Sequence, residues 1–348
     1  MPADAARTLP RRIVATMFSP AKSIGLGRTF KPAQAVLVLG EALVDRFADA
    51  AVVGGAPFNV ARSLAAFGVP TTMLTRIGDD DDDGARVLAS ALRFGLSDHA
   101  IQRDRRHATG AVTVTECDGS HRFQIHADAA WDHIALDEAR AALRAAAPRL
   151  IYFGTLAQRS ATSAATIRAL LDATPALRYL DLNLRAGQDN RELASASLER
   201  ADWVKVNDEE LRCLLVWFAP EVDAAAPEDS PSQRRGIHRL MQRFALARLI
   251  VTRGAVGYAA YDARGRRTAH GGGERVPRLV DSVCAGDAFS AAYLALQSVG
   301  RPLDASLAAA NRYAAALCAE RGALPEDPEF FRSWRAALGL AGPAAVRT

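Results

Sequence analysis

The chain has 348 residues, of which 49% are apolar and 24% charged, and this composition excludes a disordered or collagen-like protein. At roughly 150 residues per domain, the length suits about two domains' worth of mass and a large core. No apolar run approaches the ~18 residues of a membrane-spanning helix, so we expect no membrane partner.

The net charge of +4 is concentrated near the start of the chain. The first 31 residues carry six basic residues against Asp4 alone: Arg7, Arg11, Arg12, Lys22, Arg28 and Lys31. The remainder is close to neutral, so the sequence pI of about 9.0 does not indicate nucleic acid, and we expect no such partner. We interpret residues 1–34 as a disordered extension that precedes one domain over 35–340.

From residue 35 onward, short apolar runs alternate with segments of helical spacing. The runs that predict buried strands are Ala35–Leu39, Thr71–Ile77, Leu150–Phe153, Tyr179–Leu182, Trp203–Val206 and Leu249–Thr252. The segments that predict helices are Phe58–Phe67, Arg86–Phe94, Leu136–Ala146, Ala161–Leu171, Arg191–Arg200, Glu209–Trp217 and Ser290–Val299. This alternation predicts a doubly wound α/β fold whose mostly parallel sheet is covered on both faces.

Two segments interrupt this alternation. Ala111–Glu116 and His121–His126 alternate with a period of two around Asp118-Gly119, which predicts a hairpin. Such a hairpin indicates a small sheet that projects from the main one, either as a lid over a site or as a decorated edge. The stretch Ala219–Gln233 is acidic and rich in Pro and Ala, so we interpret it as a surface loop.

The cysteines and histidines do not indicate a disulfide framework or a metal centre. The four cysteines are far apart in the sequence: Cys117, Cys213, Cys284 and Cys318. This usage suits a reducing cytoplasm, so we expect a cytoplasmic protein. Three histidines lie near one another without the cysteine or carboxylate pattern of a zinc site, and we interpret them as surface or lid histidines: His121, His126 and His133.

The segment Asp281–Phe289 (DSVCAGDAF) is a loop that leads into a helix. Unpaired amides at a helix N-terminus, together with the helix dipole, favour an anion such as a transferring phosphate. Asp287 lies in the first turn, where a carboxylate could take a proton from an attacking hydroxyl while the amides hold the developing charge. An ordinary N-capping aspartate is the alternative interpretation.

A second glycine-rich segment, Gly54–Asn59, precedes a helix. Paired glycines allow a ligand to approach the backbone closely, and Asn59 could offer one donor and one acceptor to a polyol. Asp45 follows the first strand, at the sheet edge where open α/β folds bind ligands. A carboxylate there could accept two hydroxyl hydrogens, or it could cap a loop or helix.

Phosphoryl transfer on this chain would need the helix-terminus site. No lysine follows a glycine, so a P-loop is absent, and the sequence contains neither H-R-D nor D-F-G of the protein kinases. Phosphoryl transfer would therefore have to use the helix-terminus site, together with magnesium brought with ATP.

Taken together and in this order, these segments resemble the ribokinase-like (PfkB) sugar kinases, and most of all the fructokinases. The resemblance runs from about Leu37 to Pro325. The matching segments are GGAPFNVARSLAAFG, DSVCAGDAF, LDLNLR (Leu180–Arg185), Asn207–Glu210, LIVTRGAVGY (Leu249–Tyr258) and the helix Ala308–Ala323.

The resemblance implies a role for each matching residue. Asp287 would be the catalytic base, and the amides of Cys284, Ala285 and Gly286 would form the anion hole. The sugar-binding residues would be Asp45, Gly54, Gly55, Asn59 and Arg185. The nucleotide site would comprise Thr252, Gly254, Gly257 and Asn311. Asn207 and Glu210 would position hydrated Mg²⁺, and backbone oxygens around Asp281 and Val283 would hold the K⁺ ion that this family often contains.

The resemblance also implies a lid, formed by segments of about 46–56 and 99–130, and a homodimer. Arg122, Phe123 and Gln124 on the hairpin would make the contacts that discriminate between sugars. We therefore expect ATP-dependent phosphorylation of fructose to fructose 6-phosphate. The alternatives are a 2-keto-3-deoxygluconate kinase and a non-catalytic sugar or nucleotide sensor on the same fold.

Two departures from the family pattern bear on activity. Cys284 replaces the first glycine of G-A-G-D, and its Cβ is tolerated only if the loop has a negative φ there. Gly78–Gly84 (GDDDDDG) has one residue more than the family's G-x-D-x-x-G. We interpret its five aspartates as a solvated helix start rather than a metal site.

Overall fold

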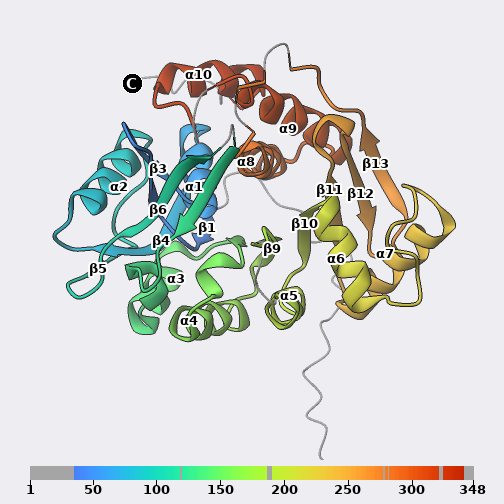
Figure 1. The fold of residues 1–348 in the computed structure, drawn as a ribbon, viewed down its shortest axis with the longest axis horizontal. Helices are drawn as coiled ribbons and strands as arrows, with labels where there is room; N and C mark the ends of the chain where they lie inside the picture. Colours follow the sequence, from blue (N-terminus) through green and yellow to red (C-terminus); the bar gives the residue numbers. More distant parts are fainter. Residues whose placement is uncertain are drawn as a thin grey trace, which may run out of the picture.

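Nine strands form the main sheet of the computed structural model, which describes residues 35–117, 120–185, 190–276, 279–280, 282–320 and 324–340 (Figure 1). The predicted extension over 1–34 lies outside the described residues. The order across the sheet is β13-β12-β11-β10-β9-β8-β1-β4-β5. The pairs β11–β12 and β12–β13 are antiparallel, and the other pairs are parallel.

The strands of the main sheet are β1 Val36–Leu39, β4 Thr71–Gly78, β5 Ile101–Asp104, β8 Leu150–Phe153, β9 Leu177–Asp181, β10 Trp203–Asn207, β11 Arg248–Thr252, β12 Tyr258–Asp262 and β13 Arg267–Gly271. The helices are α1 Ala56–Ala66, α2 Asp82–Arg93, α3 Leu136–Ala146, α4 Ala161–Asp172, α5 Arg191–Leu198, α6 Asp208–Phe218, α7 Pro231–Arg243, α8 Ala285–Ser298, α9 Leu303–Leu317 and α10 Pro328–Ala337. Short 3-10 helices are η1 Ala130–His133, η2 Leu156–Gln158 and η3 Gly254–Val256.

Helices cover both faces of this sheet. Alternate residues of β1 point to opposite sides, so that Val36 and Val38 join one core while Leu37 and Leu39 join the other. The first core packs against α1, α2, α8, α9 and α10, and the second packs against α3 to α7 (Figure 1). The predicted doubly wound α/β architecture is therefore confirmed.

A second sheet of four strands has the order β3-β2-β6-β7. Its strands are β2 Leu43–Arg46, β3 Ala51–Gly54, β6 Gly110–Cys117 and β7 Ser120–Ile125. The predicted hairpin is β6 and β7. The predicted lid boundaries differ in two places: β2 begins at Leu43, before residue 46, and Ile101–Asp104 pairs with β4 in the main sheet.

Several helices begin earlier than their apolar spacing predicts. α2 begins at Asp82 rather than Arg86, α8 at Ala285 rather than Ser290, and α9 at Leu303 rather than Ala308. First turns present capping and small residues instead of an apolar stripe, so periodicity alone misses them.

The aspartate run starts a helix as predicted, but it is only partly solvated. Asp81 is the N-cap of α2, where its side chain accepts the amide hydrogens of Gly84 and Thr109. Asp83 is buried and forms an ion pair of 2.6 Å with Arg46 of β2. The run therefore connects α2 to the second sheet.

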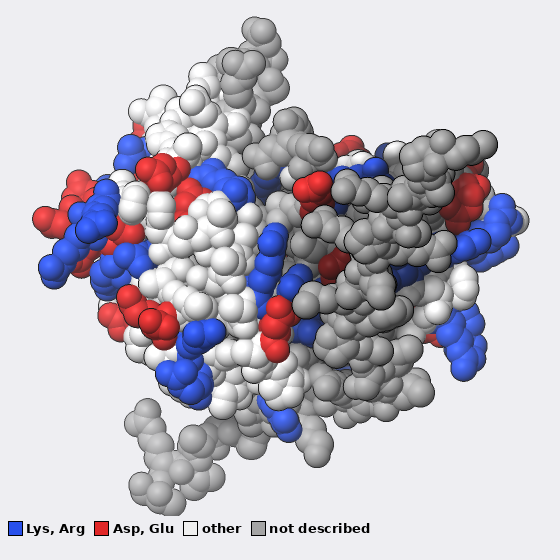
Figure 2. All heavy atoms as spheres, turned by 90° about the horizontal axis from the view of Figure 1, so that it is seen from below, with Lys and Arg blue, Asp and Glu red and all other residues white. Residues whose placement is uncertain are grey.

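Many arginines on the surface form ion pairs with acidic side chains, as Arg46, Arg200 and Arg266 do. Figure 2, seen from the side on which α4 and α5 lie, shows basic and acidic side chains interspersed over the described part of that face. The pair Arg200 and Asp172, 3.0 Å apart, is an example that joins the turn after α5 to the last residue of α4. Among the described residues, no helix is long and apolar enough to cross a membrane.

Candidate active site

The first turn of α8 places Asp287 at the centre of a buried polar cluster. Asp287 is 8% exposed, and its carboxylate accepts a hydrogen bond of 2.9 Å from Asn59 Nδ2 of α1. Burial raises the pKa of Asp287 to about 6, against the lowering effect of the Asn59 hydrogen bond. A carboxyl group whose pKa lies near the working pH is ionised often enough, and is basic enough, to take a proton from a substrate.

The loop before Asp287 accommodates Cys284 without strain. Cys284 is the N-cap of α8 with a φ of −104°, a region in which a Cβ is allowed. Its Sγ lies 3.4 Å from Asn59 Nδ2, so the thiol packs against the same amide that holds Asp287. The amides of Ala285 and Gly286 lie in the first turn of α8, the kind of position that binds anions, and in this structure the Ala285 amide donates a hydrogen bond of 3.3 Å to the carbonyl of Ser282.

We therefore expect Cys284→Gly to keep kcat within a few-fold of the natural enzyme. The loop does not need a positive φ, so a glycine relieves no strain there, and its added chain entropy would cost roughly 0.5–1 kcal/mol of unfolding free energy. Steady-state kinetics and thermal unfolding of the two proteins test this. A large gain in kcat would contradict it, because it would mean that the cysteine Cβ obstructs the loop.

A lysine absent from the sequence-based site lies directly beneath Gly286. Lys205 Nζ is 3.2 Å from the position that a Cβ on Gly286 would occupy. The same Nζ bonds both oxygens of Asp181 at 2.9 Å, and Asp181 also accepts a hydrogen bond from Ser290 of α8. Burial opposes the charge of Lys205, but Asp181 outweighs it and raises the pKa of the lysine. The anion-binding turn thus has a fixed cation below it.

Of the predicted sugar-binding residues, Asp45 and Gly54 lie in the second sheet, and Asn59 of α1 contacts the first turn of α8. Asp45 lies within β2 rather than in a loop after β1, which corrects its predicted position. Its Oδ2 is 2.8 Å from where a Cβ on Gly54 would be, so the carboxylate lies against Gly54 of β3. Gly55, with a φ of 101°, then caps α1 and aims Asn59 at Asp287.

Glu41 is a second buried carboxyl that sequence reasoning missed. It follows β1, the strand at which the order of the sheet reverses, and it is 2% exposed. Burial raises the pKa of Glu41 to about 7, opposed mainly by its own backbone amide and then by Arg185. Its Oε2 has no hydrogen-bond partner among the described residues. The only sequence signal was its place at the end of a buried strand.

Asn207 and Glu210 form a capping box at the start of α6. Asn207 Oδ1 accepts the Glu210 amide hydrogen, and Glu210 Oε2 accepts that of Asn207, both at 2.8 Å. Glu210 Oε1 accepts the amide hydrogen of Leu184, next to Arg185. The capping box therefore connects the end of β10 to the segment after β9. In that segment, Asn190 Nδ2 donates a hydrogen bond of 2.9 Å to the carbonyl of Arg185.

The predicted nucleotide residues gather at the end of β11. Thr252 is the register partner of Asn207, and its hydroxyl donates to the carbonyl of Val206. Gly257, with a φ of 116°, lies against the backbone of Gly271 and leaves no room for a side chain. Asn311 of α9 donates a hydrogen bond of 3.1 Å to the carbonyl of Gly272.

One predicted ion-binding position lies outside the described residues, and the other has an exposed side chain. Asp281 lies outside the described residues. Val283 is described, with a 60% exposed side chain. The side chain of Arg122 also lies outside the described residues, and Phe123 of β7 is 48% exposed.

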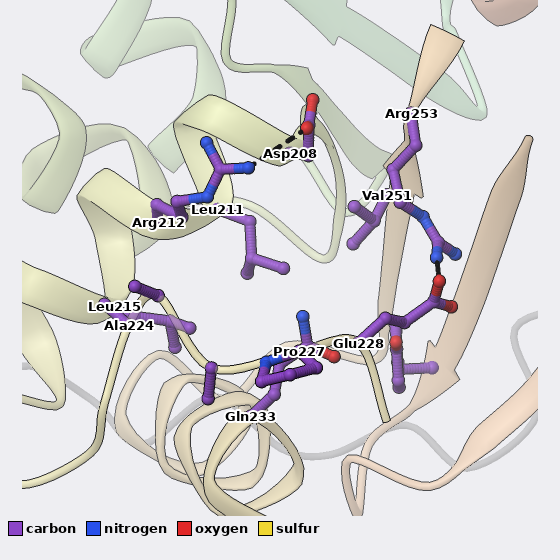
Figure 3. A pocket seen from close by; sticks show the side chains of 13 residues that line it. Asp208, Leu211, Arg212, Leu215, Ala224, Pro227, Glu228, Gln233, Val251 and Arg253 are labelled. Carbon is purple, nitrogen blue, oxygen red and sulfur yellow. Dashed lines mark hydrogen bonds and ion pairs between the residues drawn. The ribbon is translucent and has the colours of Figure 1, made fainter. Parts of the chain in front are cut away.

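A cavity of about 190 Å³ lies on the α6 side of β11 and contains none of these residues (Figure 3). Apolar residues such as Leu211 and Val251 line its interior, and a close ion pair between Arg253 and Glu228 forms one wall. The predicted surface loop 219–233 lines the cavity with Ala224–Glu228, and the prediction is wrong for its last residues, because α7 begins at Pro231. The cavity is separate from the cluster around Asp287.

The chain is similar to proteins of known family. Residues 41–329 match the family model described as "pfkB family carbohydrate kinase". A fructokinase of Escherichia coli is 29% identical over 293 residues, which cover 77% of this chain and 86% of that protein.

Two solved structures share the fold. A fructokinase of Xylella fastidiosa with bound ATP superposes with a TM-score of 0.73 at 23% identity, covering 88% of this chain and 99% of that one. A double mutant of Vibrio cholerae fructokinase, in a form bound to fructose, ADP and potassium ion, superposes with a TM-score of 0.69 at 20% identity. The match covers 87% of this chain and 98% of that one.

Proposed function

The chain belongs to the pfkB family of carbohydrate kinases, and from this we propose that it transfers the γ-phosphoryl group of ATP to the primary 6-hydroxyl of fructose. The observation that carries the proposal is the position of Asp287. Its buried carboxyl, with a pKa near 6, lies in the first turn of α8 beside Asn59 and above Lys205.

In the proposed reaction, Asp287 accepts the proton of the sugar hydroxyl while its oxygen attacks the γ-phosphorus. The P–O bond to ADP breaks as the new bond forms. The amides of Cys284, Ala285 and Gly286 hold the phosphoryl oxygens, and the helix dipole and Lys205 favour the negative charge that they carry.

The sugar would lie between the second sheet and α1. Asp45 would accept two hydroxyl hydrogens, the backbone of Gly54 and Gly55 would allow close approach, and Asn59 would align Asp287. Arg185 would contact the substrate or a phosphate. The β6–β7 hairpin, with Phe123 and Gln124 on it, would close over the sugar and exclude water.

The nucleotide would lie along Thr252, Gly254, Gly257 and Asn311. Asn207 and Glu210 offer the amide and carboxylate oxygens that suit Mg²⁺, and their mutual capping box fits a role through water rather than direct ligation. When bound, Mg²⁺ would offset charge on the phosphates. Backbone oxygens near Val283 and Asp281 would hold K⁺. A homodimer and a cytoplasmic location stay predictions.

The experiment is ADP release with Mg-ATP over a panel of fructose, glucose, ribose, 2-keto-3-deoxygluconate and adenosine. Turnover of fructose above the others is expected, because the described site and the relatives named fructokinase favour a hexose. Preference for 2-keto-3-deoxygluconate would replace fructose as the substrate. Sugar-dependent thermal protection without turnover would instead favour a sensor.

Asp45→Asn is expected to weaken use of the sugar rather than of ATP. A hydrogen bond to a charged group contributes about 1.5–3 kcal/mol, so kcat/KM for the sugar should fall about 10- to 100-fold. The KM for ATP should not change. Asp49→Asn, on the exposed β2–β3 turn, is the matched control and should leave both constants unchanged. Equal effects of the two substitutions would refute the assignment of Asp45.

A further inference from the structure

Three metal-ligating side chains meet at the base of the β6–β7 hairpin. His107 precedes β6, whereas Asp128 and His133 follow β7. One ligand atom from each of the three lies within 4.8 Å of the others. The cluster therefore joins the two strands of the hairpin at the point where they leave the body, far along the chain from Asp287 and its partners.

The two histidines present their rings to the same carboxylate. The rings stack with centroids 3.7 Å apart and planes 13° apart. His133 Nε2 lies 2.7 Å from Asp128 Oδ1, and His107 Nε2 lies 3.9 Å from the same oxygen. Metal–ligand bonds of about 2.1 Å at tetrahedral angles separate two ligand atoms by about 3.4 Å, between these two distances.

Asp104 determines which ring nitrogen of His107 is available to bind a metal ion. Its Oδ2 lies 3.1 Å from His107 Nδ1, and the carboxylate is held by Arg76 at 2.7 Å and by the amides of Arg106 and His107. A carboxylate paired in this way only accepts hydrogen bonds, so Nδ1 must donate. The lone pair of a neutral His107 is then on Nε2. A carboxylate that accepts the hydrogen of the other ring nitrogen is common at histidines that bind metals.

We propose that His107, Asp128 and His133 bind one divalent transition-metal ion of the zinc class. Two imidazoles and one carboxylate suit Zn²⁺, with a water at the fourth position, and they disfavour Mg²⁺ and Ca²⁺, which take oxygen ligands. The stacked rings would tilt apart so that each lone pair points to the ion. Asp128 is 74% exposed, so the ion has direct access from solvent.

The ion would fasten the base of the hairpin to η1. Trp131 of η1 packs against Gly110, where β6 begins, and Arg159 stacks on the Trp131 ring at 3.9 Å. Metal binding would add a cross-link between residue 107 and residues 128–133 beside this contact. The β6–β7 hairpin would then move as one body about this fixed base.

The test uses the full chain, freed of metal by a chelator, and titrated with Co²⁺. We expect one Co²⁺ per chain with the visible absorption of a four-coordinate site, displaced by Zn²⁺. His107→Gln and His133→Asn should each abolish the visible band. Asp104→Asn, a positioning residue, should lower Co²⁺ affinity about 10- to 100-fold, because it no longer orients His107.

His126→Ala is the matched control, because His126 ends the same hairpin but bonds to Thr113 outside the cluster. It should keep Co²⁺ affinity unchanged. Zn²⁺ should also raise the melting temperature of the natural chain and of His126→Ala, but not of His133→Asn. If the natural chain binds no Co²⁺, or binds it equally well in the His107 and His133 variants, the proposal is wrong. Neither outcome bears on phosphoryl transfer.

Discussion

Asp287→Asn is expected to lower kcat by about two to four orders of magnitude, the usual contribution of a positioned general base. Asparagine keeps the shape of the side chain beside Asn59 but cannot accept the hydroxyl proton. Single-turnover rates with saturating ATP and sugar test this directly. A kcat within tenfold of the natural value would remove Asp287 from the role of base.

The pH profile of the natural enzyme tests the role of Asp287 independently. The base works only when ionised, and burial raises the pKa of Asp287 to about 6, so kcat/KM should fall as the pH drops below about 6. A carboxyl whose folded pKa is raised destabilises the fold as the pH increases through that value. The asparagine variant should therefore melt at the same temperature as the natural chain or higher at pH 7.5, which excludes unfolding as the cause of lost activity.

Lys205→Met is expected to cost about 3–5 kcal/mol of unfolding free energy, because it leaves the Asp181 carboxylate buried without its partner. Asp181 is held by Lys205 at two bonds of 2.9 Å, and in the variant it would keep the hydrogen bond from Ser290. The denaturant midpoint should fall while the slope of the transition does not change. The double variant Lys205→Met, Asp181→Asn should recover part of the loss.

Arg212→Met is the matched control for this prediction. Its ion pair with Asp208, 3.4 Å apart, has both side chains about half exposed, and such pairs contribute roughly 0–1 kcal/mol. Equal midpoints for the Lys205 and Arg212 variants would mean that the buried pair does not support the fold. The Lys205 variant should also lose phosphoryl transfer, since the cation beneath Gly286 is removed.

Strands with continuous apolar runs and helices with apolar stripes could be predicted from the sequence, because burial on both faces leaves a strong pattern. β8 and α3 have the bounds that their residues indicate. β13, at the edge of the sheet, is mostly polar and was missed. α7 and α10 were missed as well, although Ser230-Pro231 and Asp327-Pro328 are ordinary helix starts that could have identified them.

For the site, the sequence could identify residues that lie in recognisable segments, but not a residue such as Lys205, which lies inside a buried strand with no motif around it. Asp287 and Asn59 were found in this way, and the structure brings them into contact. Lys205 lies in the middle of an apolar strand. A single charged residue in such a run gives no sign that it belongs to a site. Likewise His107 and Asp128 are separated by the whole hairpin, so only folding brings them together.

Lys205 is the only lysine among the described residues, since Lys22 and Lys31 lie in the segment 1–34. All other basic side chains of the described body are arginines or histidines, which do not form stable amides with reagents that acylate primary amines. Acylation at Lys205 requires the ammonium to leave Asp181 and become exposed. Pulse labelling followed by mass spectrometry of this single peptide therefore measures how often the sheet opens under the anion-binding turn, with no engineered probe.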